Sequence, residues 1–485
     1  MVACGGCVRT VAFHPDAQLR AQTFDFYWEF VKETHPYLEL PGMDWQAARD
    51  EHRERAIKAR NTLEFYSEMD RMFARLKDPH TNFHSNRYKT FNPSSPGGIW
   101  NIDLQTITVQ RAVYVYSWPG SMGCLPYHDT QYPQLLQVGT NTNVDVYSGD
   151  SQLVIGEETL QIVAKYPDGS LQRIDAYGPW ELMQGTSTGS FYASQLFSVR
   201  YPFMADTSLE LSSAVYRAPM YVHTSGYTLI AAESSLDHPF AHLERAEKSN
   251  PKSVRKPWWI DWKNLGPIRY IRISTLDDES RNNGNKDRDV NGWIQVACHN
   301  VHEYDKVIID LRYNSGGNAK FVQEALGYFA SKPLRIVFDE RKEYFGLVTY
   351  ISGFRVDPRS PNFKGQIVVL VNQETASAAE WLATSLKSLA NATLIGETTI
   401  GAESPVTRVT GPDGSTLSTS QKYKYPMPFS GYQSKGVTPD IEIPLTIQRV
   451  REIGLAEAIR ETEVMQIKAA GDVLGVDLTP YLRSY

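Results

Sequence analysis

The sequence predicts an α/β protein with a helical region before its core and a β-rich domain between the two. Three patterns lead to this prediction: helical spacing of apolar residues over 18–75, short alternating runs over 92–249, and strands alternating with helices from 258 onward. Such alternation is typical of an α/β layer architecture. We therefore expect a helical region, a β-rich domain, an α/β core and a C-terminal helical tail, at residues 1–90, 91–250, 251–448 and 449–485.

The helical region should contain three helices and end in a turn. Apolar side chains recur at helical spacing from Phe24, a polar helix is predicted over about 45–60, and a third helix over 63–76. Pro79 stops the third helix because proline has no backbone N–H to donate. His80 is therefore expected in a constrained turn, where a histidine is usually structural or solvated unless it has a partner.

The middle of the chain has the alternation of polar and apolar residues that favours β-strands. Runs of this kind, separated by turn residues, occur at 112–116, 160–166 and 220–224. The polar stretch 249–257 holds two prolines and is the expected linker to the α/β core.

The α/β core is predicted from apolar runs that are followed by amphipathic segments. Strands are expected at 268–274, 306–312, 366–371 and 393–396, and helices at 318–330, 377–390 and 455–469. Two of the strand-to-helix turns carry residues suited to chemistry, the pair Gly316–Gly317 and Ser377.

Ser377 lies where a buried strand ends and a helix begins. Backbone N–H groups are unpaired there and the helix dipole favours negative charge, so the position suits a nucleophile and an oxyanion. An isolated serine at such a turn is more often only a helix cap. At the other turn, Gly316 and Gly317 let the backbone approach a ligand and direct N–H groups outward. That turn lacks the Lys-Ser/Thr of a nucleotide loop, so with Ser377 it predicts an oxyanion hole.

Composition and charge argue against several classes of protein. The net charge of −6 and the pI near 6.0 give no electrostatic footprint for nucleic acid, so we expect no nucleic-acid partner. No apolar run reaches the roughly 18 residues that a membrane-spanning helix needs. The N-terminus lacks the cationic and apolar regions of a signal peptide, which favours a cytoplasmic location. A secreted or periplasmic protein trimmed of its signal would have the same pattern, so that location stays open.

Cysteine content gives no sign of a disulfide scaffold, because four cysteines are too few in a chain of 485 residues. Cys4 and Cys7 have the spacing of a metal knuckle or a redox pair, but no second pair completes a zinc site. We therefore expect no metal and no other cofactor.

Four blocks of the sequence, in order, resemble the signatures of one family. They are residues 310–317, 369–380, 395–401 and 435–440. Together they resemble the tail-specific (carboxyl-terminal processing) protease and tricorn core protease family, over roughly residues 268–444. The resemblance implies a catalytic core of the ClpP/crotonase-like spiral type and a serine peptidase activity. It also implies that Ser377 is the nucleophile, with an oxyanion hole from Ala378 and the Gly316–Gly317 turn.

The catalytic base implied by the resemblance depends on the branch of the family. The tail-specific branch uses a lysine 25 residues after the serine, and that position is Ala402 in this chain. A methyl group cannot accept a proton, so a Ser–Lys dyad is excluded in this register. The tricorn-like branch uses a histidine from the N-terminal region, and His80 matches it. That branch has a serine just before its histidine, where this chain has Pro79.

The residue that orients the histidine is left open by the sequence. In the tricorn-like branch it is a glutamate a few residues before the last block, but here residues 433–435 carry no carboxylate. Gln433 and Glu403 are the two candidates. A buried imidazolium formed during turnover needs a compensating charge, which favours Glu403.

The middle domain lies where members of the family carry a PDZ-like peptide-binding module. Residues 149–157 loosely resemble part of the PDZ pattern, whereas the usual carboxylate-binding loop is not recognisable. A PDZ-like domain is the expectation and a plain β-rich spacer is the alternative.

Three functions remain open from the sequence alone. The first is a serine peptidase that acts through an acyl-enzyme on Ser377 with His80 as base. The second is a catalytically inactive peptide-binding homologue, and the third is an enzyme of the same fold that passes the acyl group to an amine or alcohol. In each case the expected partner is a peptide or a protein, and an oligomer stays open.

Overall fold

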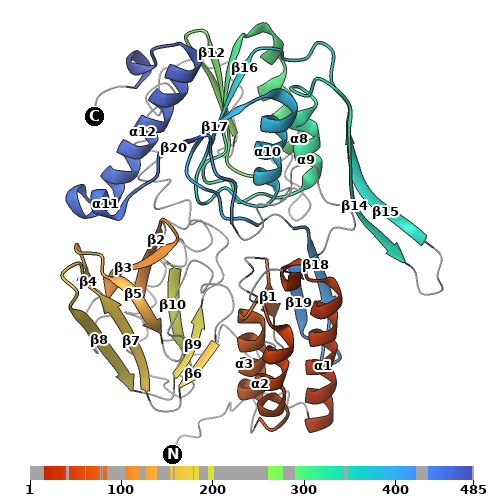
Figure 1. The fold of residues 1–485 in the computed structure, drawn as a ribbon, viewed down its shortest axis with the longest axis vertical. Helices are drawn as coiled ribbons and strands as arrows, with labels where there is room; N and C mark the ends of the chain where they lie inside the picture. The colour runs from red at the N-terminus through yellow and green to blue at the C-terminus, as the bar shows by residue number, and fades with distance from the viewer. Residues whose placement is uncertain are drawn as a thin grey trace, which may run out of the picture.

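The structure is a computed structural model of the whole chain. It describes residues 16–482 apart from 40–42, 60–61, 77, 79, 85–103, 119–126, 139–152, 157–158, 178–179, 185–194, 201–259, 277–289, 343–347, 403 and 422–434. Figure 1 shows the α/β core at one end of the molecule, and the N-terminal helices and a large β-sheet at the other.

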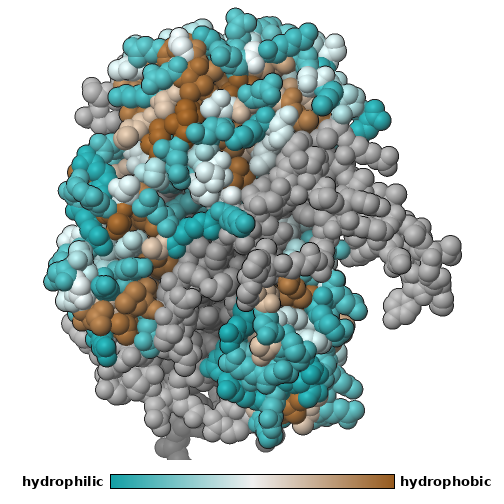
Figure 2. All heavy atoms as spheres, viewed as in Figure 1, coloured by the Kyte–Doolittle hydropathy of each residue, from teal (hydrophilic) through white to brown (hydrophobic). Residues whose placement is uncertain are grey.

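Three helices form the N-terminal region, as the sequence predicts. They are α1 (Ala17–Thr34), α2 (Trp45–Ile57) and α3 (Thr62–Ala74), and the 3-10 turn η1 (Pro36–Glu39) follows the first. Side chains of Asp16 and Asp44 accept N–H groups in the first turns of α1 and α2, which satisfies donors that would otherwise be unpaired. The helices bury their aromatic faces against one another, and their outer surface in Figure 2 is mostly hydrophilic.

A three-stranded antiparallel sheet joins these helices to residues from the C-terminal half of the chain. Its order is β1 (Asn82–His84), β19 (Thr416–Ser420) and β18 (Val406–Thr410). Leu417 of β19 is fully buried in the same cluster as the aromatic residues of the helices. The β1–β19 pairing therefore brings the turn that holds His80 next to residues more than 300 positions later.

The middle of the chain folds as a nine-stranded sheet whose pairings are all antiparallel. This confirms the predicted strands at 112–116 and 160–166, whereas 220–224 and the linker 249–257 lie outside the described residues. The strands are β2 (Leu104–Val109), β3 (Ala112–Trp118), β4 (Tyr127–His128), β5 (Gln134–Val138), β6 (Leu153–Gly156), β7 (Thr159–Lys165), β8 (Leu171–Tyr177), β9 (Trp180–Gln184) and β10 (Gln195–Arg200).

The α/β core is built on a six-stranded sheet of order β11-β12-β13-β16-β17-β20. All its pairings are parallel except β11 with β12. The strands are β11 (Ile260–Leu265), β12 (Ile268–Ile273), β13 (Lys306–Asp310), β16 (Gln366–Val371), β17 (Thr393–Gly396) and β20 (Ile441–Glu442). Parallel strands are buried on both faces, which explains their continuous apolar runs.

Helices cover both faces of the core sheet. One face packs against α8 (Val290–Cys298), α9 (Ala319–Leu326) and α10 (Ala378–Ala390). The other face packs against α12 (Leu455–Leu474), which follows the short helix α11 (Ile447–Ile453). A last 3-10 turn, η5, spans Thr479–Tyr481. None of the helices described is long and apolar enough to cross a membrane.

Several parts of the core were not predicted, and β11 and β20 are among them. Helix α8 carries Gly292 and two valines, which lower its intrinsic helix propensity, and it is held by the burial of Ile294, Ala297 and Cys298. The hairpin of β14 (Leu334–Lys342) and β15 (Val348–Val356) extends from the core in Figure 1, and these two strands pair only with each other in the described sheets.

Candidate active site

Ser377 sits in a strained turn between β16 and α10. Its backbone has a φ of 53° and a ψ of −122°, a combination that residues other than glycine rarely adopt. The ordinary N-cap Asp16 has a φ of −67°, in the extended region. Holding one residue in such a conformation costs about 1–3 kcal/mol, and strain of this kind clusters at functional sites. Ser377 is thus more than a helix cap.

The two strand-to-helix turns of the site are bonded to each other. The Ala376 N–H donates to the Asn314 carbonyl at 2.9 Å, and the Tyr313 N–H donates to Asn372 Oδ1 at 2.9 Å. These contacts join the loop after β13 to the loop that carries Ser377. The glycine pair and the serine are therefore held side by side.

Gly316 is required for this close approach. Its φ is 94°, and a Cβ placed on it would lie 2.8 Å from Ser377 Cβ and 2.9 Å from the Ala378 nitrogen. The Gly316 N–H donates to Asn314 Oδ1 at 2.9 Å. The Gly316 N–H is therefore engaged within its own loop, and the residue leaves room for Ser377; its role as an oxyanion donor stays a prediction.

The other two predicted oxyanion donors are the backbone N–H groups of Gly317 and Ala378. Within the described part of the chain, the N–H groups of Gly317 and Ala378 donate to no protein acceptor. Gly317 has a φ of 137°, and Ala378 is the first residue of α10, where helical N–H groups have no partner within the helix.

Glu380 is a site residue that the sequence reasoning missed. Its buried carboxylate accepts hydrogen bonds from the N–H groups of Ser377 at 2.9 Å, Gly401 at 2.8 Å and Ala402 at 2.8 Å, and from the Thr399 hydroxyl. Burial raises the pKa of Glu380 to about 7, and these hydrogen bonds oppose that rise. A serine followed three residues later by glutamate is the capping-box signature, which was the available signal.

His80 lies in the turn before β1, as predicted. Its Nδ1 is 3.5 Å from the Ser420 hydroxyl, and the ring also makes a hydrogen bond to the backbone of Ser404. Gly401 and Ala402 are linked to Ser377 through the Glu380 carboxylate, and Ser404, two positions after Ala402, contacts His80. No hydrogen bond joins His80 directly to Ser377 in the described structure.

The surroundings of His80 favour its neutral form. Burial lowers the pKa of His80, and His35 acts in the same direction. The Asp78 carboxylate and the hydrogen bond to Ser404 favour the charged form, but the net shift of the pKa is downward. At neutral pH the imidazole can therefore accept a proton.

Asp78 is a second residue that the sequence reasoning did not assign to the site. This buried carboxylate accepts hydrogen bonds from the hydroxyls of Thr81 at 2.6 Å and Ser420 at 2.9 Å, and it contacts His35 Nε2 at 3.0 Å. Burial alone would raise the pKa of Asp78, but His35, His80 and Thr81 together hold it well below its usual value. Asp78 is therefore ionised.

The two candidate orienting residues, Glu403 and Gln433, lie outside the described residues, so both stay predictions. Ala402 is described and buried, and its N–H donates to Glu380. Cys4 and Cys7, for which no metal or redox role is expected, also lie outside the described residues.

The middle domain contacts the turn before Ser377 and the loop after β17. Arg111, in the turn between β2 and β3, donates to the carbonyls of Thr399 at 2.9 Å and Lys435 at 2.6 Å. The Gln373 side chain donates to the carbonyl of Thr108 at 2.6 Å. The nine-stranded sheet thus contacts the turn before Ser377 and the loop after β17.

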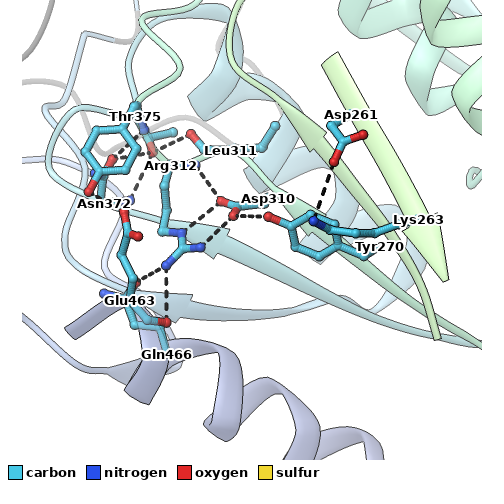
Figure 3. A network of polar contacts seen from close by, with 11 residues as sticks. Asp261, Lys263, Tyr270, Asp310, Leu311, Arg312, Asn372, Thr375, Glu463 and Gln466 are labelled. Carbon is cyan, nitrogen blue, oxygen red and sulfur yellow. Dashed lines mark hydrogen bonds and ion pairs between the residues drawn. The ribbon is translucent and has the colours of Figure 1, made fainter. Parts of the chain in front are cut away.

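The Asp310-Leu-Arg312 block has a structural role. Arg312 is buried and pairs with Asp310 through two hydrogen bonds, at 2.9 and 2.6 Å (Figure 3). Tyr270 donates to Asp310 at 2.7 Å, and Arg312 donates to Gln466 on α12 at 2.9 Å. This network fixes the end of β13, from which the glycine turn leaves, against α12.

A serine at a strained strand-to-helix turn with unpaired backbone donors beside it, on a mixed α/β fold, is typical of serine-type hydrolases. Comparison with known proteins narrows this class. Residues 267–443 match the model of peptidase family S41. The chain is 22% identical to a carboxyl-terminal-processing protease of Picosynechococcus sp., over 98% of this chain and 92% of that protein. It is 28% identical to the carboxy-terminal processing protease CtpB of Bacillus subtilis, over 36% of this chain and 34% of CtpB. The chain is therefore similar to the tail-specific (carboxyl-terminal processing) proteases, and these similarities support a serine-type peptidase.

The fold is also similar to a solved structure along nearly its whole length. Mature CPAF aligns with a TM-score of 0.51 at 14% identity, over 94% of this chain and 98% of CPAF. The mixed α/β sheets described above are therefore those of an S41 peptidase fold.

Proposed function

We propose that this serine peptidase cleaves peptide bonds in a protein or peptide substrate through an acyl-enzyme on Ser377, with His80 as the base. The observation that carries the proposal is the strained backbone of Ser377 beside the unpaired N–H groups of Gly317 and Ala378. A helix cap needs neither the strain nor the neighbouring donors.

The reaction follows from these groups. Ser377 Oγ attacks the carbonyl carbon of the substrate while His80 accepts its proton, and the Gly317 and Ala378 N–H groups bind the oxyanion. The imidazolium then gives the proton to the leaving amine, so the C–N bond breaks and the acyl ester stays on Ser377. Water attacks this ester with His80 again as base, which releases a carboxylic acid and restores the serine.

His80 is favoured as the base for two reasons. Ala402 fills the position of the lysine in the tail-specific branch, and the surroundings of His80 lower its pKa so that the imidazole is neutral. Catalytic hydrogen bonds are often absent without substrate and form in the complex, so the missing Ser377–His80 bond is compatible with this role. A histidine base places the chain nearer to the tricorn-like branch.

The same proposal includes the type of the α/β core, the nature of the middle domain and the division of the chain into domains. Five parallel strands with helices on both faces support a ClpP/crotonase-like core at about residues 251–448. The middle part, about 91–250, is β-rich, and peptide binding by a PDZ-like module there stays a prediction. The helical region at 1–90 and the tail at 449–485 complete the proposed division.

Labelling with a fluorophosphonate probe tests the proposal, because only an activated serine reacts. We expect one label on Ser377, located by mass spectrometry, and none in Ser377→Ala. Ser388→Ala, an exposed serine on the same helix, is the matched control and should label normally. Failure of the wild-type chain to label would favour the inactive peptide-binding alternative. Transfer of the acyl group to an added amine without hydrolysis would favour the acyl-transfer alternative.

A further inference from the structure

His80 has no carboxylate in direct contact with its ring nitrogens among the described residues. The nearest ionised group is Asp78, and the Ser420 hydroxyl lies between the two. Ser420 Oγ is 2.9 Å from Asp78 Oδ1 and 3.5 Å from His80 Nδ1. Asp78 and Ser420 are both buried, so these contacts are screened from water.

The position of each proton follows from what the groups can donate. An ionised carboxylate is only an acceptor, so the single hydroxyl hydrogen of Ser420 points to Asp78. Ser420 then presents a lone pair to His80, and a favourable contact needs a hydrogen on Nδ1. The backbone of Ser404 also favours a hydrogen on the ring. A neutral imidazole has one ring hydrogen, so with that hydrogen on Nδ1 the other nitrogen, Nε2, can accept a proton from a serine.

We propose that Asp78 and Ser420 are the positioning residues of His80. The Ser420 hydroxyl donates to Asp78 and accepts from His80 Nδ1, so the negative charge of Asp78 stabilises the Nδ1–H tautomer through Ser420. This inference rests on the proposed role of His80 as the base. It assigns the orientation of the imidazole to residues other than Glu403 and Gln433.

The arrangement is fixed from several sides. Asp78 is held by His35 at the end of α1 and by Thr81, while its second contact with Ser420 comes from the Ser420 backbone N–H at 3.2 Å. The charged or titratable groups that face His80 are thus Asp78 and His35. The 3.5 Å contact is longer than a usual hydrogen bond, so it should shorten when the imidazolium forms and the attraction to Asp78 increases.

The first test measures the rate of fluorophosphonate labelling at Ser377 in the full chain. Ser420→Ala removes the relay and should slow labelling by about 10- to 100-fold, which is part of the contribution of a general base. Ser420→Thr keeps a hydroxyl and should stay within a few-fold of wild type. Ser418→Ala is the matched control, since it removes a buried hydroxyl of the same strand that pairs with Arg408 instead. An equal loss in Ser418→Ala and Ser420→Ala would overturn the proposal.

The second test reads the tautomer directly and does not depend on activity. Nitrogen-15 spectra of labelled histidine, with His80→Gln to assign the signals, should show His80 with hydrogen on Nδ1. In Ser420→Ala the population should shift toward hydrogen on Nε2. A wild-type His80 with hydrogen on Nε2 would overturn the proposal, even if Ser420→Ala lowers the labelling rate.

A His80→Ala variant separates failure of this inference from failure of the proposed function. Normal labelling of Ser377 in His80→Ala would show that His80 is not the base, and both proposals would fall. Loss of labelling in His80→Ala, together with a Ser420→Ala rate within twofold of wild type, would refute only the positioning role.

Discussion

At the scale of single residues, the site depends on backbone conformations that ordinary side chains avoid. Ser377 has a φ of 53°, and Gly316 facing it has a φ of 94°. Hydrogen bonds between the two loops and to Glu380 maintain both conformations. The geometry of the oxyanion donors therefore depends on a residue without a side chain at position 316.

Gly316→Ala should lower both stability and reactivity. The new methyl would meet Ser377 Cβ at 2.8 Å, so we expect a loss of about 2–4 kcal/mol from overpacking and backbone strain. Fluorophosphonate labelling should fall because Gly317 and Ala378 N–H groups move apart. Gly169→Ala is the matched control: its φ is 88° but no atom lies within 4 Å of the added methyl. If urea unfolding gave equal losses of stability for Gly316→Ala and Gly169→Ala, backbone strain alone, and not the contact with Ser377, would explain the loss.

The labelling rate should rise with pH through the titration of His80. The neutral imidazole is the active form, so the rate is low below the pKa of His80 and reaches a plateau above it. Because burial lowers this pKa, we expect the midpoint below the ordinary value of about 6.5. A midpoint above pH 7 would favour a carboxylate in direct contact, and Glu403→Gln should then shift it back and slow labelling. An unchanged profile in Glu403→Gln removes Glu403 from the mechanism.

At the scale of elements, a buried ion pair fixes the end of strand β13. Arg312 and Asp310 lie almost fully buried at the end of β13, and α12 completes their hydrogen bonds through Gln466. The glycine turn begins directly after this pair. Helix α12 thus helps to hold the oxyanion donors without reaching them.

Arg312→Met should be strongly destabilising. It leaves the Asp310 carboxylate buried without its partner, which costs about 3–5 kcal/mol. The control is Arg355→Met, whose ion pair with Asp357 is exposed and should contribute at most about 1 kcal/mol. Urea unfolding of both variants checks the difference. A loss below about 1 kcal/mol in Arg312→Met would mean that the network is not needed for the fold.

At the scale of the whole molecule, the proposed catalytic residues Ser377 and His80 come from parts of the chain that only the tertiary structure joins. The sheet of β1, β19 and β18 connects the N-terminal helices to the core, and Arg111 connects the nine-stranded sheet to the loop after β17. The helical region and β19 share one hydrophobic cluster. These parts should therefore unfold together.

Leu417→Ala should loosen the N-terminal helices as well as β19. Removing a fully buried leucine costs about 2–5 kcal/mol, and its contacts are with the helical region. Hydrogen exchange should become faster in α1, α3 and β19 alike. Leu394→Ala, buried in β17 of the core, is the matched control and should leave exchange in α1 and α3 unchanged. Unchanged exchange in the helices of Leu417→Ala would show that the two parts unfold separately.

Local patterns in the sequence determined most of the elements. The spacing of apolar residues located α1–α3, β16, α10 and β17 to within a few residues, because helical and strand periodicity repeat over short stretches. They missed α8, the β14–β15 hairpin and the strands β11, β18, β19 and β20. Helix α8 depends on burial of its side chains more than on its own propensity.

The sequence by itself indicated Ser377 as the candidate nucleophile and the glycine turn beside it, since each lies where a buried strand meets a helix, and the four blocks indicated the family resemblance. Only the tertiary structure decided what surrounds them. In the folded chain the Gly316 N–H donates to Asn314, and the Ser377 N–H donates to Glu380. Ser420 lies beside His80, although 340 positions separate the two in the sequence. No periodicity encodes such a contact. It arises because β1 pairs with β19 and the helices bury Leu417, and both depend on the folding of the whole chain.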